Sequence, residues 1–469
     1  MTLDALEIIH TANAAVEARY ADRLKPNSRL SRQMVSFQAN KTRPGYRWFK
    51  YKEGFSEALV HFLLDYLRLE HGHLLDPFAG TGTTLFAASG RGIDATGVEL
   101  LPVGVEIVEV RKLTQGDPAD ELLATVRRWR GERPWQRFRT SAAFPHLRIT
   151  SGAFPDETQA QLERFIDAAN AEPGDSARLL RFAAMCILEE ISYTRKDGQY
   201  LRWDYRSGRR QGSRPFDKGV IYAFDEAVDR KLAEIAEDLQ PSGFLPGFFE
   251  PTASRGSIEI LRGSCLNILP SLPAASFDGL ITSPPYANRY DYTRTYALEL
   301  AMLGVSEAEI RALRQAMVSC TVENRDKTWL NSRFPEEVYG KAVRAFDSQQ
   351  ELQAVLRYLE HQKQAKLLNN PGIPRMVRNY FFEMALIIFE CARLLRPDAP
   401  FVMVNDNVRY GGAVIPVDLI LSDFAESAGF DVEVIWTLPT GKGNSSQQMG
   451  AHGREELRKC IYLWRRRRS

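Results

Sequence analysis

The residues best suited to chemistry form a short loop, Thr282-Ser283-Pro284-Pro285-Tyr286, directly after the apolar run 277–281. The two prolines fix two φ angles and remove two backbone donors, so this loop is stiff. It holds a hydroxyl, the carbonyl of Pro284 and the ring of Tyr286 close together. The two oxygens can accept the hydrogens of an exocyclic amine, while the ring stacks on a planar ligand. A double-proline turn at a strand end is the plain structural alternative.

A second loop far upstream, Asp76-Pro77-Phe78-Ala79-Gly80-Thr81-Gly82-Thr83, follows a short apolar strand and leads into a helix predicted to begin near Thr83. Its glycines let the backbone approach a ligand closely, and the helix start offers free N–H groups. The loop lacks the Gly-Lys-Ser/Thr ending of a phosphate-binding loop. Leu85 stands where a dinucleotide fingerprint has its third glycine. The next strand ends in Glu99, placed to accept ribose hydroxyls.

Together, these two loops resemble those of S-adenosylmethionine-dependent DNA amino-methyltransferases. That family has an Asp-Pro-Phe-x-Gly-x-Gly-Thr-Thr cofactor loop and an Asp/Asn/Ser-Pro-Pro-Tyr/Phe catalytic loop, and the Ser form is most similar to its N4-cytosine branch. The resemblance implies S-adenosyl-L-methionine as cofactor and double-stranded DNA as substrate. It implies catalytic roles for Ser283, Pro284, Pro285 and Tyr286. The implied cofactor-binding residues are Phe55, Ser56, Asp76, Pro77, Phe78, Gly80, Gly82, Thr83, Glu99 and Ser264.

Within this cofactor site the resemblance assigns Asp76 to the ligand's ammonium and Phe78 to its edge. Phe55 and Ser56 match an element that closes over the methionine part in the family, although an aromatic cluster before a helix is also typical of core packing. The family usually has Asp where this chain has Ser264. The contact to the adenine amine therefore stays open.

The implied reaction is direct methyl transfer to the exocyclic N4 of a cytosine flipped out of the duplex. Hydrogen bonds to Ser283 and to the carbonyl of Pro284 would localise the lone pair of the amine and aim it. Methylation at carbon 5 would need a Pro-Cys nucleophile, and no cysteine follows a proline here. N6-adenine methylation is the nearest alternative. An RNA amino-methyltransferase, a cofactor-gated DNA-binding subunit and a dehydrogenase-type nucleotide binder also remain open.

Segment 193–219 interleaves basic and aromatic side chains, a pattern that favours contact with nucleic acid. A solvated, charged loop is the structural alternative. The polar loop 441–454, between the last two expected strands, is a further candidate for the base pocket or for phosphate contacts, and equally for a connector. The predicted DNA-binding residues are Arg195, Lys196, Arg202, Trp203, Arg206, Arg209 and Arg210.

The elements that would position these residues indicate an α/β protein with a doubly wound, seven-stranded, Rossmann-like methyltransferase sheet and mainly helical insertions. Ligands of such sheets lie beyond the carboxyl ends of the strands, which would bring the two loops to one rim. Helices are predicted over 119–131, 157–170, 177–192 and 222–239. The expected organisation is an N-terminal helix and arm (1–45), a catalytic domain (46–110, 251–304 and 375–469), a helical insertion that is the candidate DNA-recognition region (111–250) and a second helical insertion (305–374).

Composition is that of an ordinary globular protein, with 44% hydrophobic and 26% charged residues and a net charge of +2. Affinity for DNA must therefore come from local patches. The five cysteines are scattered without Cys-x-x-Cys spacing, which indicates a reduced, cytoplasmic protein without disulfides or a bound metal. No apolar run has the length of a membrane span. A restriction endonuclease is a candidate partner, while the recognition sequence and the oligomeric state stay open.

Overall fold

The computed structural model describes residues 2–115, 119–140, 142–197, 201–212, 214–240, 255–438 and 457–468. The predicted loop 441–454 lies outside these residues. The centre of the molecule is an eight-stranded sheet with the order β1-β11-β12-β8-β7-β2-β3-β6. Its strands are β1 (Leu24–Pro26), β2 (His73–Asp76), β3 (Asp94–Glu99), β6 (Ile258–Arg262), β7 (Gly279–Thr282), β8 (Pro400–Asp406), β11 (Phe430–Thr437) and β12 (Lys459–Arg466).

Neighbouring strands in this sheet are parallel, except that β12 runs antiparallel between β8 and β11. The inner parallel strands β2, β3, β7 and β8 are almost fully buried on both faces, as in other parallel sheets, whereas the edge strands β1 and β6 are partly exposed. Consecutive residues such as Leu74 and Leu75 point to opposite faces and join two different hydrophobic cores. The predicted doubly wound α/β fold is therefore confirmed.

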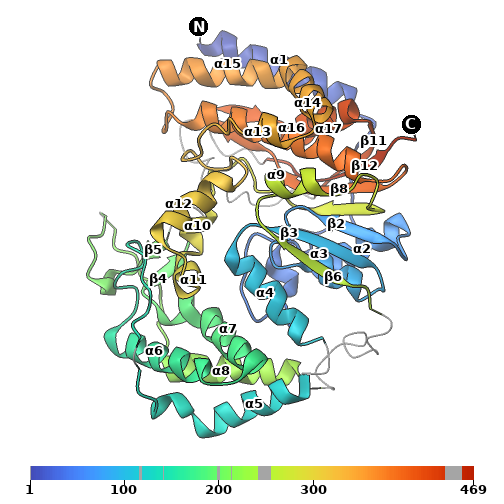
Figure 1. Ribbon diagram of the computed structural model, residues 1–469. Helices are drawn as coiled ribbons and strands as arrows, with labels where there is room; N and C mark the ends of the chain where they lie inside the picture. Colours follow the sequence, from blue (N-terminus) through green and yellow to red (C-terminus); the bar gives the residue numbers. More distant parts are fainter. Residues whose placement is uncertain are drawn as a thin grey trace.

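Helices cover both faces of the sheet (Figure 1). One core contains residues of α2 (Glu57–Leu67) and α3 (Thr83–Ser89). The other contains residues of α14 (Glu336–Ser348), α15 (Gln350–Gln364), α16 (Ile373–Leu394) and α17 (Val417–Ala428). Short elements add buried residues to this second core: α9 (Cys265–Ile268), α13 (Leu330–Arg333) and the hairpin of β9 (Val408–Tyr410) and β10 (Ala413–Ile415).

The N-terminal segment, predicted as a helix and arm, contains a helix followed by a short strand of the central sheet. Helix α1 (Thr2–Arg19) lies beside α15 at the top of Figure 1. The following strand, β1, pairs in parallel with β11 at the sheet edge, with Leu24 opposite Ile435. This eighth strand has only three residues, two of them exposed, so the sequence has no alternating pattern that could reveal it.

The first insertion is a helical unit with its own core, at the bottom of Figure 1. The four predicted helices are present to within three residues at each end: α5 (Ala119–Glu132), α6 (Asp156–Asn170), α7 (Gly174–Ile191) and α8 (Phe224–Asp238). The core also takes in α4 (Pro102–Leu113) and α11 (Ala297–Met302). A two-stranded hairpin, β4 (Thr194–Lys196) and β5 (Leu201–Trp203), extends from this unit.

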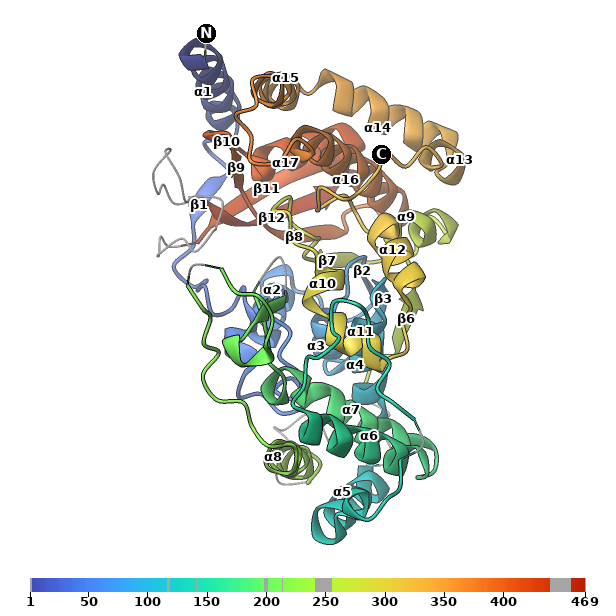
Figure 2. The ribbon, with the colours of Figure 1, turned by 90° about the vertical axis from the view of Figure 1, so that its left-hand side faces the viewer.

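The second insertion begins after α10 (Tyr292–Thr295) and α11 with α12 (Glu307–Ala316), whose start carries a capping box between Ser306 and Glu309. These helices run along one side of the molecule between the sheet and the first insertion, as Figures 1 and 2 show. A buried ion pair fixes the chain beyond α12. The ammonium of Lys327 lies 2.6 Å from the carboxylate of Glu383 on α16, and Ser319 donates to the same carboxylate from its backbone and its hydroxyl.

This ion pair generates a prediction about stability. Both side chains are at most 3% exposed, so Lys327→Met would leave the carboxylate of Glu383 buried without its counter-charge. We expect a loss of about 3–5 kcal/mol in the free energy of unfolding. The double variant Lys327→Met/Glu383→Gln should recover most of that loss. Denaturant titration of the three proteins measures it, and equal losses in the single and double variants would contradict the assignment.

Candidate active site

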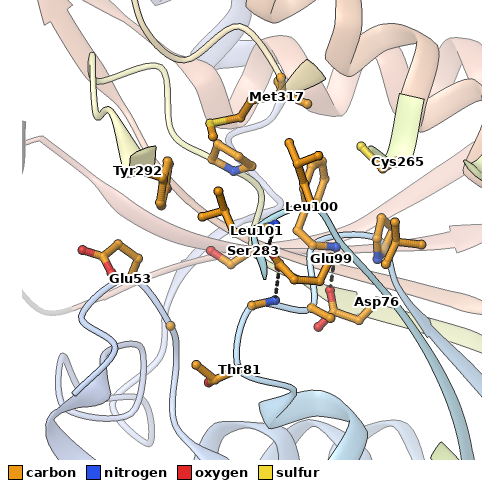
Figure 3. A pocket seen from close by; sticks show the side chains of 18 of the residues that line it. Glu53, Asp76, Thr81, Glu99, Leu100, Leu101, Cys265, Ser283, Tyr292 and Met317 are labelled. Carbon is orange, nitrogen blue, oxygen red and sulfur yellow. Dashed lines mark hydrogen bonds between the residues drawn. The ribbon is translucent and has the colours of Figure 1, made fainter. Parts of the chain in front are cut away.

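A pocket of about 800 Å³, including the open solvent at its mouth, lies at the carboxyl ends of β2, β3, β6 and β7 (Figure 3). Both motif loops line it, the glycine-rich loop after β2 and the Ser-Pro-Pro-Tyr loop after β7. The meeting of loops that lie far apart in sequence is the arrangement that the parallel strand order predicts. Among the predicted residues, the pocket is lined by Phe55, Asp76, Pro77, Phe78, Gly80, Thr83, Glu99, Ser264, Ser283 and Pro285.

Asp76 ties the two loops together. Its carboxylate accepts a hydrogen bond from the hydroxyl of Thr282 at 2.6 Å and one from the backbone N–H of Phe78 at 3.1 Å. Thr282 directly precedes Ser283, so this bond sets the start of the Ser-Pro-Pro-Tyr loop against the glycine-rich loop. Burial raises the pKa of Asp76 to about 6, because an ionised carboxylate loses its hydration there.

Glu99, at the end of the neighbouring strand β3, lines the pocket beside Asp76. One carboxylate oxygen accepts from the backbone N–H of Gly80 and the other from that of Leu101, both at 2.7 Å. Burial raises its pKa to about 7. Gly104, at the start of α4, allows the Gly80 backbone to lie this close to Glu99, because a Cβ at position 104 would be 2.6 Å from the carbonyl oxygen of Gly80. The carboxylate is thus held rigidly, with lone pairs left for ligand hydroxyls.

The hydroxyl of Ser283 is oriented from behind by the neighbouring strand. Its Oγ lies 3.1 Å from the carbonyl oxygen of Val404 on β8 and 3.4 Å from the hydroxyl of Tyr286. Because a carbonyl can only accept, the Ser283 hydrogen points to Val404 and lone pairs of Oγ remain as acceptors. Pro284 is buried, and neither Pro284 nor Tyr286 lines the pocket of Figure 3.

Two predicted cofactor residues serve the fold and do not line the pocket. Ser56 is buried at the N-cap of α2, where its hydroxyl accepts from Leu59 N–H at 3.4 Å and donates to the Met34 carbonyl at 2.8 Å. Gly82 caps α3 with φ +72°, and a Cβ on it would lie 2.8 Å from Val108. The hydroxyl of Ser56 is thus used by the helix and by Met34, and its predicted contact with the cofactor stays a prediction.

Ser264, which stands where the family usually has Asp, anchors the end of α12 beside the pocket. Its hydroxyl donates to the carbonyl of Ala316 at 2.7 Å, so it holds the end of α12 against the pocket. The next two residues, Met317 and Val318, then line the pocket. Sequence reasoning missed both, because nothing in the pattern of the second insertion indicates a ligand. It also missed Tyr51, Glu53, Leu100, Leu101 and Tyr292.

Glu53 could have been identified from the sequence, since it stands two residues before Phe55, which was itself a predicted cofactor residue. It lines the pocket and accepts hydrogen bonds from the hydroxyls of Tyr290 and Tyr296. The ring of Tyr296 stacks on Tyr51 with 5.0 Å between centroids. This aromatic group joins the segment before α2 to the chain that follows the catalytic loop.

The predicted DNA-binding residues differ in their exposure and in their contacts within the protein. Lys196 is the clearest correction: it is buried, its ammonium lies 2.5 Å from Glu299, and it rests over two aromatic rings. Arg206 is held by Asp204 through two hydrogen bonds of 2.6 and 2.9 Å. Arg209 donates to the Ser151 carbonyl and stacks on Trp203. The exposed side chains are Arg195, Arg202, Arg206 and Arg210. Arg202 also pairs with Asp197 at 3.4 Å and lies over the ring of Phe216.

Among the described residues, no group of three or more His, Cys, Asp or Glu side chains is arranged to hold a metal ion. Within the same part of the chain, no helix combines the length and the apolar character that a membrane crossing requires.

The buried carboxyl of Asp76 generates a prediction about pH and stability. Its folded pKa of about 6 lies above its ordinary value of 3.8, so ionisation costs folding free energy at neutral and alkaline pH. Asp76→Asn keeps the acceptor for Thr282 without the charge. We expect this variant to be more stable than the wild type by up to about 3 kcal/mol at pH 8, with the gain shrinking as the pH falls toward 4. Denaturant titration across this range measures it; a gain independent of pH would contradict the assignment.

No protein-family model matches the chain. Two curated relatives named Type II methyltransferase M.AvaI, from Nostoc sp. and Anabaena variabilis, are each 51% identical to it over 459 residues, covering 97% of this chain and 93% of the relative. Type II methyltransferase M.BsoBI from Geobacillus stearothermophilus is 40% identical over 472 residues, with 96% and 91% covered. The chain thus belongs to the type II DNA methyltransferases, enzymes that take the methyl group from S-adenosyl-L-methionine.

Proposed function

We propose that this methyltransferase transfers the methyl group to the exocyclic N4 of a cytosine flipped out of double-stranded DNA. The observation that carries the proposal is the Ser283 hydroxyl, whose hydrogen is directed to Val404 beside the pocket. An oxygen held in this way presents lone pairs to an amine. N6-adenine methylation would use a similar acceptor, so this hydroxyl alone does not distinguish the two bases. The choice of cytosine is supported by the resemblance of the Ser form of the loop to the N4-cytosine branch.

The proposed chemistry is one of orientation and charge placement. The N4 hydrogens donate to Ser283 Oγ and to the carbonyl of Pro284, which localises the nitrogen lone pair and directs it toward the pocket. Tyr286 stacks on the extruded ring and offsets part of the cost of unstacking. S-adenosyl-L-methionine supplies a methyl group on a sulfonium centre, a reactive donor that needs no covalent enzyme intermediate.

The pocket residues fit the cofactor by charge and shape. Asp76 offers a buried carboxylate to the ammonium group, and Glu99 offers lone pairs to the ribose hydroxyls. The apolar side chains of Phe55, Phe78 and Leu101 supply the walls. Both acids carry raised pKa values because they are buried, and a cationic or hydroxyl-bearing ligand favours their ionised forms.

We infer that the β4–β5 hairpin contacts the DNA backbone. Arg195 and Arg202 stand directly opposite each other in its register and both are exposed. Like charges in such cross-strand positions destabilise a hairpin. Asp197 pairs with Arg202 at 3.4 Å, and an anionic ligand between the two arginines would relieve the remaining repulsion. Arg210 is exposed nearby, and the stacked pair Arg209 and Trp203 adds a flat surface. A restriction endonuclease with the same recognition sequence is the companion expected from a type II system.

The reaction itself is tested with tritiated cofactor and DNA that is digested to nucleosides after reaction. We expect label in N4-methylcytosine, and Ser283→Ala should lower kcat by about 100-fold or more, as for loss of one preorganised polar contact. Cofactor affinity should change less than twofold. Ser271→Ala, at an exposed serine after α9, serves as the matched control. Label in N6-methyladenine would contradict the proposal and identify adenine as the target base.

The hairpin is tested by the salt dependence of DNA affinity. Each lost phosphate contact lowers the slope of log affinity against log salt by about 0.9, so Arg195→Gln/Arg202→Gln should lower it by about 2. Arg127→Gln, exposed on α5, is the control and should leave the slope unchanged. Equal slopes for the hairpin variant and the wild type would remove the hairpin from the DNA interface.

A further inference from the structure

Two charged residues close the end of the sheet beside Tyr286 and have no role in the chemistry described above. Asp406 is the last residue of β8, Lys459 is the first of β12, and the two are cross-strand partners. The ammonium of Lys459 lies 3.4 Å and 3.5 Å from the two carboxylate oxygens of Asp406. It also lies over the ring of Tyr286, 5.8 Å from the centroid.

This ion pair is loose for its surroundings. Charge-assisted hydrogen bonds usually measure about 2.7–2.9 Å, and both contacts here are longer. Oδ1 of Asp406 is buried and accepts no hydrogen bond from the described residues. The ammonium of Lys459 stays charged: burial works against it, but Tyr286 and Asp406 raise its pKa above the ordinary value. Among the described residues, Lys459 therefore has donor capacity that is not fully used.

The position of this ammonium relates directly to the catalytic loop. Val404, which orients Ser283, stands two residues before Asp406 on the same strand. Ser283 lies beside the hydroxyl end of Tyr286, at 3.4 Å. A base whose amine reaches Ser283 while its ring stacks on Tyr286 therefore has the rest of its edge within the neighbourhood of Lys459.

We propose that Lys459 recognises the flipped base by donating hydrogen bonds to the ring acceptors next to the amine, and that Asp406 positions its ammonium. In cytosine these acceptors are N3 and O2, which carry partial negative charge. On its Watson–Crick edge adenine offers only N1 beside its amine, followed by the C2–H group, so a lysine facing this edge favours cytosine. This inference rests on the proposed function of the site and adds the residue that selects the base.

The test compares Lys459→Met with the wild type on two duplexes. Mapping of the methylated product first locates the target base. One duplex then carries this base, and the other carries an abasic site at the same position. On the first duplex we expect DNA affinity to fall about tenfold, the usual effect of one lost charged hydrogen bond. On the abasic duplex the two proteins should bind equally, because no base is present for Lys459 to contact. Cofactor affinity should be unchanged.

The control is Lys341→Met, which removes an exposed lysine paired with Glu337 on α14 and should match the wild type on both duplexes. An equal loss for Lys459→Met on both duplexes would overturn the proposal, since it would indicate a phosphate contact or a structural role. No loss on either would overturn it as well. The nucleoside product of the wild type tests the cytosine assignment separately, so the two failures are distinguishable.

Discussion

The hydrogen bond between Asp76 and Thr282 is the contact on which the rest of the site depends. It joins the ends of two adjacent parallel strands, β2 and β7, and so places the glycine-rich loop and the Ser-Pro-Pro-Tyr loop on the same pocket. Each loop is stiff in itself, one through prolines and one through a helix start packed against α4. A single short bond between stiff parts fixes their relative position more firmly than several bonds between flexible ones would.

The pocket is made from groups that are costly to bury. Asp76 and Glu99 have raised pKa values because they are enclosed, so the empty site lowers the stability of the fold at neutral pH. The surrounding structure offsets this cost with extensive hydrophobic packing. Acids of this kind are common at functional sites, where a ligand supplies the complementary charge or hydrogens.

Much of the fold and of the pocket could be predicted because local patterns determine them. The strand ending in Asp76, the helix start at Thr83 and the acid at Glu99 follow from residue type and spacing, and the parallel strand order brings them to one rim. The motif that assigned Ser56 to the cofactor does not reveal that its hydroxyl also caps its own helix. Lys196 was assigned to DNA because a charge run does not show that alternate hairpin residues point inward toward Glu299.

The remaining misses share a cause, since they depend on contacts between distant segments. Met317 and Val318 reach the pocket only because Ser264 holds the end of α12, and no local pattern encodes that contact. The strand β1 has too few residues to be seen without its partner. A sequence thus predicts elements and motif loops well, and predicts poorly which side chain from another element completes a site.

The pairing of β1 with β11 also bears on how the chain is made. Leu24 lies opposite Ile435, and β12, which separates β8 from β11, comes later still in the chain. During synthesis β1 therefore stays unpaired until almost all of the described chain has left the ribosome. Contacts of such high sequence separation form slowly, while helices α5–α8 pack mainly on one another over a shorter stretch of chain. The nascent enzyme thus acquires a folded insertion well before its sheet is complete, which delays the appearance of a working methylase.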